Sequence, residues 1–166
     1  MPLDATIPVA VPGALGQYTR RALIVPELRE RDTAGIIGEL SHVLQQEGCV
    51  ADVLPFYHTA LNQELLCNSG LECGLAFPHA RLGGVKQLTF ALGRAPEPVI
   101  WGAKGSWRVQ FVFLLAVPPT DAACYSNLLA SLARLGQQTK VLDLLRAART
   151  ADAILAVLET VGVRQG

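Results

Sequence analysis

Apolar and polar residues follow three successive patterns along this chain. Between residues 33 and 66 apolar positions recur every three or four residues, which predicts two helices. From 75 to 117 they alternate or run together, which predicts short strands. The last of these, Val109–Val117, is an almost unbroken apolar run, typical of a central strand covered on both faces. The helical period then returns and predicts three more helices after residue 121.

Polar residues and glycine mark the ends of the first two helices. Asp32 or Thr33 is suited to cap the first helix, and Gly48 is suited to end it. The second helix is predicted to begin near Asp52 and to end before Asn68-Ser69-Gly70. Its expected apolar face consists of Leu54, Tyr57, Leu61 and Leu65.

The order of these elements indicates the fold class. A strand at Arg21–Val25, two helices, a cluster of strands that includes Leu75–Phe77, and three closing helices predict an α/β fold. We expect a single-domain sandwich with a central mixed β-sheet flanked by helices. Residues 1–20 are rich in Pro and Gly and show no period, so we expect an N-terminal leader or peripheral segment there and the domain at 21–166.

Composition excludes several classes of protein. The chain has 166 residues, of which 51% are apolar and 17% charged, so a disordered chain is excluded. The formal net charge is zero and the basic residues are dispersed, which argues against nucleic-acid binding. Apolar runs stay below the roughly 18–20 residues of a membrane span. We therefore expect no direct membrane insertion, no signal peptide and a cytoplasmic location.

The cysteines favour neither a disulfide framework nor a metal site. Cys49, Cys67, Cys73 and Cys124 form no CxxC pair, and no histidine lies at zinc-finger spacing, so we expect reduced thiols and no metal. Cys67 or Cys73 with His79 would be a thiol–imidazole pair for nucleophilic catalysis. No acidic orienting residue is apparent in the sequence, and packed or incidental thiols are the favoured interpretation.

The three histidines differ in their surroundings. His42 and His58 lie within predicted helices and are interpreted as surface or core residues. His79 follows Pro78 at the end of a predicted strand and precedes a Gly-Gly turn. Strand ends in α/β sheets commonly present reactive groups, so His79 is the candidate functional histidine.

The segment Gly74–Arg81, with the sequence GLAFPHAR, resembles the active-site segment of a known family. It is similar to the enzyme IIA domains of the fructose/mannitol class (type 2) of the phosphoenolpyruvate-dependent sugar phosphotransferase system, which include nitrogen-regulatory IIA-like proteins. The resemblance continues in Asn68–Leu71, Glu97–Gly102, Val112–Pro118 and the closing helices, from about residue 20 to the C-terminal end. It implies the phosphotransferase/anion-transporter-type fold.

The resemblance also implies a phosphorelay. His79 would accept a phosphoryl group from the phosphocarrier protein HPr or a paralogue, then pass it to a cysteine of a IIB domain or keep it as a regulatory mark. Neutral imidazole is nucleophilic near pH 7. We expect Nε2 of His79 to attack while Nδ1–H is held by the main chain, and we expect no cofactor. The sugar, the transport or regulatory role, and any homodimer are left open by the sequence.

Two positions depart from the family pattern. Relay members carry an arginine sixteen residues before the histidine and a second histidine about forty-six residues after it; here these positions are Gln63 and Tyr125. A hydrogen bond to a charged group is worth about 1.5–3 kcal/mol against about 1 for a neutral pair, so phosphoryl stabilisation falls by roughly 1–3 kcal/mol, or about 5- to 150-fold. Ser69 and Arg81 are the further candidate lining residues. The alternative function is a IIA-fold regulatory or binding module with weak or no phosphotransfer.

Overall fold

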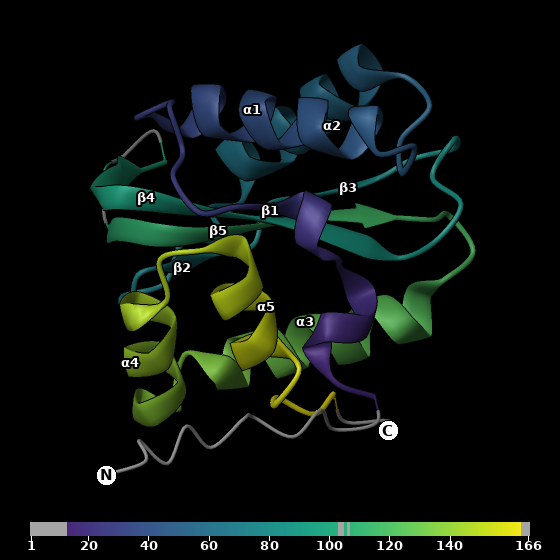
Figure 1. Ribbon diagram of the computed structural model, residues 1–166. Helices are drawn as coiled ribbons and strands as arrows, with labels where there is room; N and C mark the ends of the chain where they lie inside the picture. Colours follow the sequence, from purple (N-terminus) through teal and green to yellow (C-terminus); the bar gives the residue numbers. More distant parts are fainter. Residues whose placement is uncertain (1–12, 103–104, 106, 164–166) are drawn as a thin grey trace, which may run out of the picture.

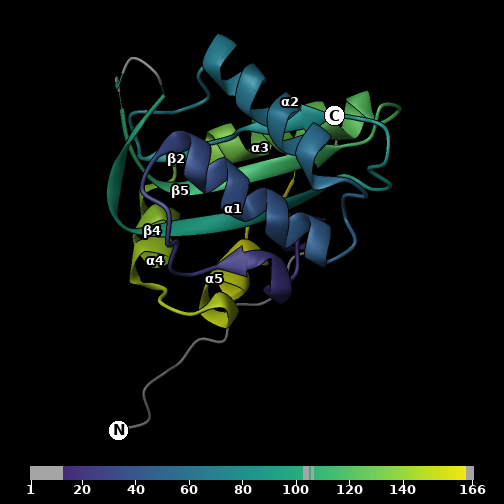
Figure 2. The same ribbon diagram turned by 90° about the horizontal axis from the view of Figure 1, so that it is seen from above.

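Two layers of helices enclose a five-stranded sheet (Figure 1). The computed structural model describes residues 13–102, 105 and 107–163. The helices are α1 (Thr33–Gln46), α2 (Val53–Leu66), α3 (Ala122–Leu135), α4 (Thr139–Ala147) and α5 (Ala151–Leu158). Figure 2 shows α1 and α2 across one face of the sheet, while α3, α4 and α5 cover the other face. The predicted mixed sheet flanked by helices is confirmed.

The sheet is mixed, and its longest strands lie at its centre. The strands are β1 (Ile24–Val25), β2 (Leu75–Ala76), β3 (His79–Arg81), β4 (Thr89–Trp101) and β5 (Trp107–Val117). Their order is β1-β4-β5-β2, with β3 also beside β5. Only the β4–β5 pair is antiparallel, and the short strands pair in parallel. The apolar run at the C-terminal end of the strand region is therefore the central strand that the sequence predicted.

Residues on β5 alternate between two hydrophobic cores because successive side chains of a strand point to opposite faces. Val112, Leu114 and Ala116 pack with α1 and α2. The residues that pack instead with the α3–α5 layer are Phe111, Phe113, Leu115 and Val117. All seven are almost completely buried, which explains why the sequence shows no polar position there.

The N-terminal segment is only partly described, since residues 1–12 lie outside the described residues. Of the remainder, Leu15 is fully buried in the core between the sheet and the α3–α5 layer. Its N–H donates to the Val161 carbonyl at 2.8 Å. The strand predicted at Arg21–Val25 is wrong in length, because residues Arg21–Leu23 form a 3-10 turn and only Ile24–Val25 pair with β4. The glycines of Gly102–Gly105 predict a hairpin-type loop, and residues 103–104 within it also lie outside the described residues.

Helix α2 is rotated relative to the predicted orientation. Its buried residues are Phe56, Ala60 and Glu64, whereas Leu54 and Leu65 are 62% and 53% exposed. The prediction of an apolar face containing these leucines is therefore wrong. The i, i+4 row with the bulky Phe56 and the small Ala60 packs on the sheet, and the carboxylate in the same row is satisfied by hydrogen bonds inside the protein.

Replacing Asp32 with alanine should lower the free energy of unfolding by about 1 kcal/mol, within the 0.5–2 kcal/mol typical of N-caps. Its side chain accepts a hydrogen bond from the Gly35 N–H at 2.7 Å, which satisfies one of the free donors of α1. Asp52→Ala in α2 is the matched control, because that cap bond is longer, at 3.4 Å. Urea unfolding measures the free energy of unfolding of both variants. An equal loss in the two would contradict the assignment of Asp32 as the stronger N-cap.

Candidate active site around His79

The candidate site begins where the pairing of the edge strand with β5 is interrupted. Strand β2 pairs with Phe111–Val112 of β5, and β3 resumes pairing further along, with His79 opposite Leu115. Between them the Phe77 N–H leaves the sheet and donates to Ser69 Oγ at 2.9 Å. Pro78, the next residue, accepts from the Leu115 N–H but has no N–H to donate to β5, so β2 ends at Ala76, one residue before the strand end that the sequence predicted. The interruption places His79 at the start of a new strand on the edge of the sheet.

Strand alternation places His79 and Arg81 on the same face. Ala80, between them, packs in the core under α1 and α2. The His79 ring lies 5.3 Å from the ring of Tyr125 on α3, centroid to centroid, at an interplanar angle of 43°. The guanidinium carbon of Arg81 lies 5.9 Å from the same Tyr125 ring, within the range of a cation–π contact. The structure thus brings together three of the five residues singled out in the sequence.

A buried carboxylate holds the segment that precedes His79. Glu64 is only 2% exposed, and it accepts hydrogen bonds from Trp101 Nε1 at 2.6 Å and from the Ser69 N–H at 2.8 Å. The Ser69 hydroxyl also donates to this carboxylate, at 2.8 Å, and accepts from the Phe77 N–H. A chain of hydrogen bonds therefore connects α2 and the end of β4 to the residue two positions before the histidine.

The surroundings of His79 favour the neutral imidazole. Burial lowers the pKa of His79 below its ordinary value, and the positive charge of Arg81 acts in the same direction. A hydrogen bond between the ring and the main chain of Phe77, together with the negative charge of Glu64, opposes this lowering of the pKa. The main-chain bond fixes one ring nitrogen, and a neutral ring leaves a lone pair on the other. The side chain is half-buried, so it remains reachable from outside.

The lowered pKa of His79 predicts a pH-dependent stability. The unfolded chain binds this proton more readily than the folded one, so the free energy of unfolding should fall as the pH drops below the unfolded value of about 6.5 and stop falling below the folded pKa. Urea unfolding between pH 8 and pH 5 measures the slope. His79→Gln should flatten it, and His58→Gln, the same substitution on the exposed side of α2, is the comparison variant. An equally steep slope in His79→Gln would contradict the prediction.

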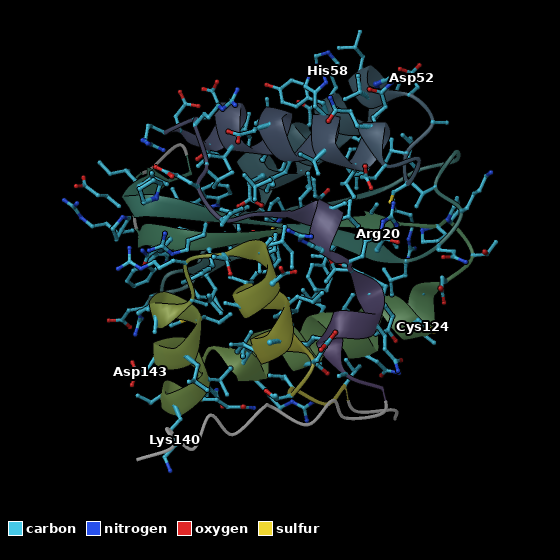
Figure 3. All side chains as sticks on the ribbon, in the orientation of Figure 1. Arg20, Asp52, His58, Cys124, Lys140 and Asp143 are labelled. Carbon is cyan, nitrogen blue, oxygen red and sulfur yellow. The ribbon has the colours of Figure 1, made fainter. Side chains whose placement is uncertain are left out.

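The other predicted candidates lie apart from this cluster. Gln63 is exposed on α2, and no described hydrogen bond or ring contact joins it to His79. His42 is exposed, and Figure 3 shows His58 on the outer side of the helix layer. Cys73 packs against the core between the sheet and the α3–α5 layer. Cys67, an exposed free thiol, is the exception. Burial raises the pKa of Tyr125, Arg81 lowers it, and Cys67 adds to the raising, so this thiol lies near the cluster.

Sequence reasoning did not identify Glu64 or the role of Trp101. The available signal was the row Phe56, Ala60, Glu64 at helical spacing, which combines a large apolar, a small apolar and a charged residue. A charged residue in such a row indicates either an exposed face or a buried carboxylate with partners. The choice depends on Trp101, which is 37 positions away in sequence.

The described part of the chain contains neither a metal-binding cluster nor a membrane span. Within 13–102, 105 and 107–163, no group of three or more His, Cys, Asp or Glu side chains is placed to hold a metal ion. Over the same residues, no helix is both long and apolar enough to cross a membrane.

Comparison with known proteins identifies the family. Residues 17–161 match the family model described as "Phosphoenolpyruvate-dependent sugar phosphotransferase system, EIIA 2". The chain belongs to this EIIA family. The match spans the site segment, both helix layers and the whole sheet, so the resemblance of Gly74–Arg81 to the family's active-site segment is part of a similarity over most of the chain.

Relatives within the EIIA family have both transport and regulatory names. The chain is 31% identical over 133 residues to the "PTS system 2-O-alpha-mannosyl-D-glycerate-specific EIIABC component" of Escherichia coli, covering 76% of this chain but only 20% of that protein. The chain thus corresponds to about a fifth of that relative. It is 26% identical to the "Nitrogen regulatory protein" of Pseudomonas aeruginosa, over 74% of this chain and 80% of that one.

Solved structures of the family have the same fold. The "Nitrogen Regulatory Protein IIA-Ntr" of Neisseria meningitidis superposes with a TM-score of 0.71 at 29% identity, covering 87% of this chain and 98% of that one. The IIA mannitol protein of Escherichia coli superposes with a TM-score of 0.71 at 18% identity, over 84% and 97% of the two chains, and at this identity it supports the fold alone.

Proposed function

We propose that this chain is a phosphoryl relay protein in which His79 accepts a phosphoryl group from phosphorylated HPr or a paralogue and passes it on. The recipient is a cysteine of a IIB domain, or the phosphorylated state itself acts on a regulatory target. The proposal places the chain in the cytoplasm, where such carriers act. The observation that carries it is a half-buried, neutral-favouring imidazole, hydrogen-bonded to the main chain, at the edge of an EIIA-family sheet.

The chemistry follows from the geometry of the ring. One nitrogen of His79 is engaged by the main chain at Phe77, so the other attacks phosphorus with its lone pair while the bond to the carrier's histidine breaks. The phosphoryl group moves from nitrogen to nitrogen and no other bond changes. Catalysis then consists of positioning and charge stabilisation, with Ser69 positioning the segment through Phe77.

Arg81 supports the proposal because it supplies a positive charge on the His79 face. Gln63 and Tyr125 supply none, although both side chains can donate hydrogen bonds. Arg81 is exposed, and its guanidinium group lies over the Tyr125 ring that contacts His79. A phosphoryl group bearing roughly −1.5 to −2 charges would draw this guanidinium toward it. Arg81 would then partly replace the charges that the family carries elsewhere.

An exposed apolar surface beside the site supports a protein partner. Leu65 and Leu66, at the C-terminal end of α2, are 53% and 85% exposed, and Cys67 and Asn68 next to them are exposed as well. Large exposed apolar side chains beside a reactive group are typical of docking surfaces. In a solved complex, the mannitol IIA protein of Escherichia coli is bound to its phosphorylated IIB partner, which is the kind of encounter proposed here.

The proposal is tested by incubating the full chain with HPr of its own organism, enzyme I and labelled phosphoenolpyruvate. We expect stoichiometric label that is stable in alkali and lost in acid, as phosphohistidine is. A well-folded chain that takes up no label from phosphorylated HPr would overturn the relay function.

Arg81→Gln should lower the rate of phosphoryl uptake by His79 about 10- to 100-fold, because a charge-assisted hydrogen bond of about 1.5–3 kcal/mol is lost. Rapid-quench measurement of labelling gives the rate. Arg108→Gln is the matched control, since Arg108 is also exposed but lies near the other end of β5. Equal rates in the Arg81 and Arg108 variants would show that Arg81 does not stabilise the phosphoryl group.

The second candidate function is a regulatory or binding module that keeps the EIIA fold with weak or no phosphotransfer. The observation that favours it is the absence of positive charge at the two positions that depart from the family pattern. Gln63 is exposed on α2, and Tyr125 lies against the His79 ring. The double variant Gln63→Arg/Tyr125→His separates the two. A sharp rise in labelling rate supports the binding module, and little change supports a native site that already works with Arg81.

A further inference from the structure

A second group of charged residues lies at the opposite end of the sheet from His79. It surrounds a cavity of about 290 Å³ lined by Pro26, Glu27, Arg94, Pro96 and Arg149. The first two residues follow β1, and the next two lie at the register shift in β4, which spans Arg94 to Val99. Arg149 lies in the turn between α4 and α5. Phe90 of β4 and His79 of β3 both lie opposite Leu115 of β5. Arg94 is four residues beyond Phe90 along β4, which corresponds to about 13 Å.

Arg94 occupies a position where the strand otherwise carries apolar side chains. Phe90 and Leu92, four and two residues earlier, pack in the core beneath the sheet. Arg94 is only 6% exposed, its Nε has no hydrogen-bond partner, and Nη1 makes a long contact of 3.4 Å to the Pro26 carbonyl. A buried donor without a partner costs about 1–3 kcal/mol, and more for a charged group. This side chain is therefore incompletely satisfied in the chain by itself.

The second arginine increases the excess of positive charge. Arg149 lines the same cavity, and no ion pair within 4 Å joins either arginine to an acidic side chain among the described residues. Burial lowers the pKa of Arg94, the charge of Arg149 lowers it further, and Glu27 opposes both. Two guanidinium groups against one carboxylate leave one net positive charge at a partly desolvated site.

We propose that this cavity is an anion-binding site for a phosphate group, either free inorganic phosphate or the phosphate end of a small metabolite. Guanidinium groups match the geometry of phosphate oxygens and bind them through paired, charge-assisted hydrogen bonds. The unpartnered Nε of Arg94 is the donor that such an oxygen would satisfy. A volume of about 290 Å³ lies at the lower end of the usual range for small-molecule sites, which suits a small phosphate ester better than a nucleotide.

The site is independent of the phosphoryl group on His79. It uses neither Arg81 nor Tyr125, and it takes its residues from β4, the segment after β1 and the α4–α5 turn. A phosphate bound there would link the α4–α5 turn to the sheet through Arg149 and Arg94. It would therefore raise the free energy of unfolding, by an amount that grows with the logarithm of its concentration above the dissociation constant.

The test is titration of the full chain with inorganic phosphate and, separately, with glycerol 3-phosphate, followed by the NMR signals of the arginine Nε–H groups. We expect saturable shifts of the Arg94 Nε–H signal. Arg149→Gln should weaken binding about tenfold or more, and Glu27→Gln should strengthen it several-fold by removing the opposing charge. Tighter binding of the ester would identify a metabolite as the ligand, and equal binding would identify free phosphate.

Arg146→Gln is the matched control. It removes the same charge from an exposed arginine three residues earlier, outside this cavity. Equal weakening of phosphate binding in the Arg146 and Arg149 variants would overturn the proposal. It would show that phosphate responds only to the overall positive charge of this region and not to a site. Shifts that never saturate, or that appear only around His79, would overturn it too. Arg149 is exposed, so its variant is expected to fold, and circular dichroism checks this.

Discussion

His79→Gln should abolish phosphoryl uptake from phosphorylated HPr, with no measurable acid-labile label at any time. Glutamine has a similar volume and keeps a hydrogen-bond donor for the main chain of Phe77, but its amide nitrogen has no lone pair available for attack. Stoichiometric labelling, followed by acid and alkali treatment, measures the loss. The expected loss is complete because no other described group in the cluster of Arg81, Tyr125 and His79 is a comparable nucleophile near pH 7.

His58→Gln is the matched control for this prediction. It makes the same substitution on the exposed outer side of α2, where Figure 3 shows the ring directed away from the sheet. This variant should be labelled like the wild type. Label that persists in His79→Gln would point to another acceptor. Alkylation of Cys67 would then show whether the exposed thiol near Tyr125 is that acceptor.

Glu64→Leu should lower the free energy of unfolding by about 2–6 kcal/mol, a large share of the 5–15 kcal/mol typical of a domain. The substitution leaves the Trp101 Nε1–H and the Ser69 N–H without their acceptor, at about 1–3 kcal/mol for each buried donor. It also frees the Ser69 hydroxyl that holds the Phe77 N–H. Urea unfolding measures the loss, and phosphoryl uptake should fall as well because His79 loses its positioning.

Gln63→Leu is the control for the carboxylate. Gln63 lies one residue before Glu64, on the exposed face of α2. Its substitution should change the free energy of unfolding by no more than about 0.5 kcal/mol. In the double variant Glu64→Leu/Trp101→Phe, the indole donor is removed together with its acceptor, so the two losses should not add. If Glu64→Leu proved as stable as Gln63→Leu, the carboxylate would not be the group that organises this segment.

Local sequence patterns were sufficient to predict the order of the elements and the fold class. The helical period before residue 66 and after residue 121, with alternating and apolar runs between them, corresponds to the observed layers. The caps at Asp32 and Asp52 form the side-chain bonds expected of them. These features depend on residues within one or two turns of each other, where local spacing and capping chemistry are sufficient. The segment Gly74–Arg81 likewise indicated the family through its own residues, without reference to their neighbours in space.

The rotation of α2 and the composition of the site depend on long-range packing and could not be predicted from local patterns. Apolar residues occur around most of α2, so its period does not select a single face, and contact with the sheet buried Glu64 instead of Leu65. The partners of Glu64 and His79 are Trp101 and Tyr125, at separations that local spacing cannot encode. The same holds for Arg94 and Arg149, which line one cavity from two distant segments. Such pairs form only when strand register and helix packing bring the segments together, because burial makes each polar group depend on a distant partner.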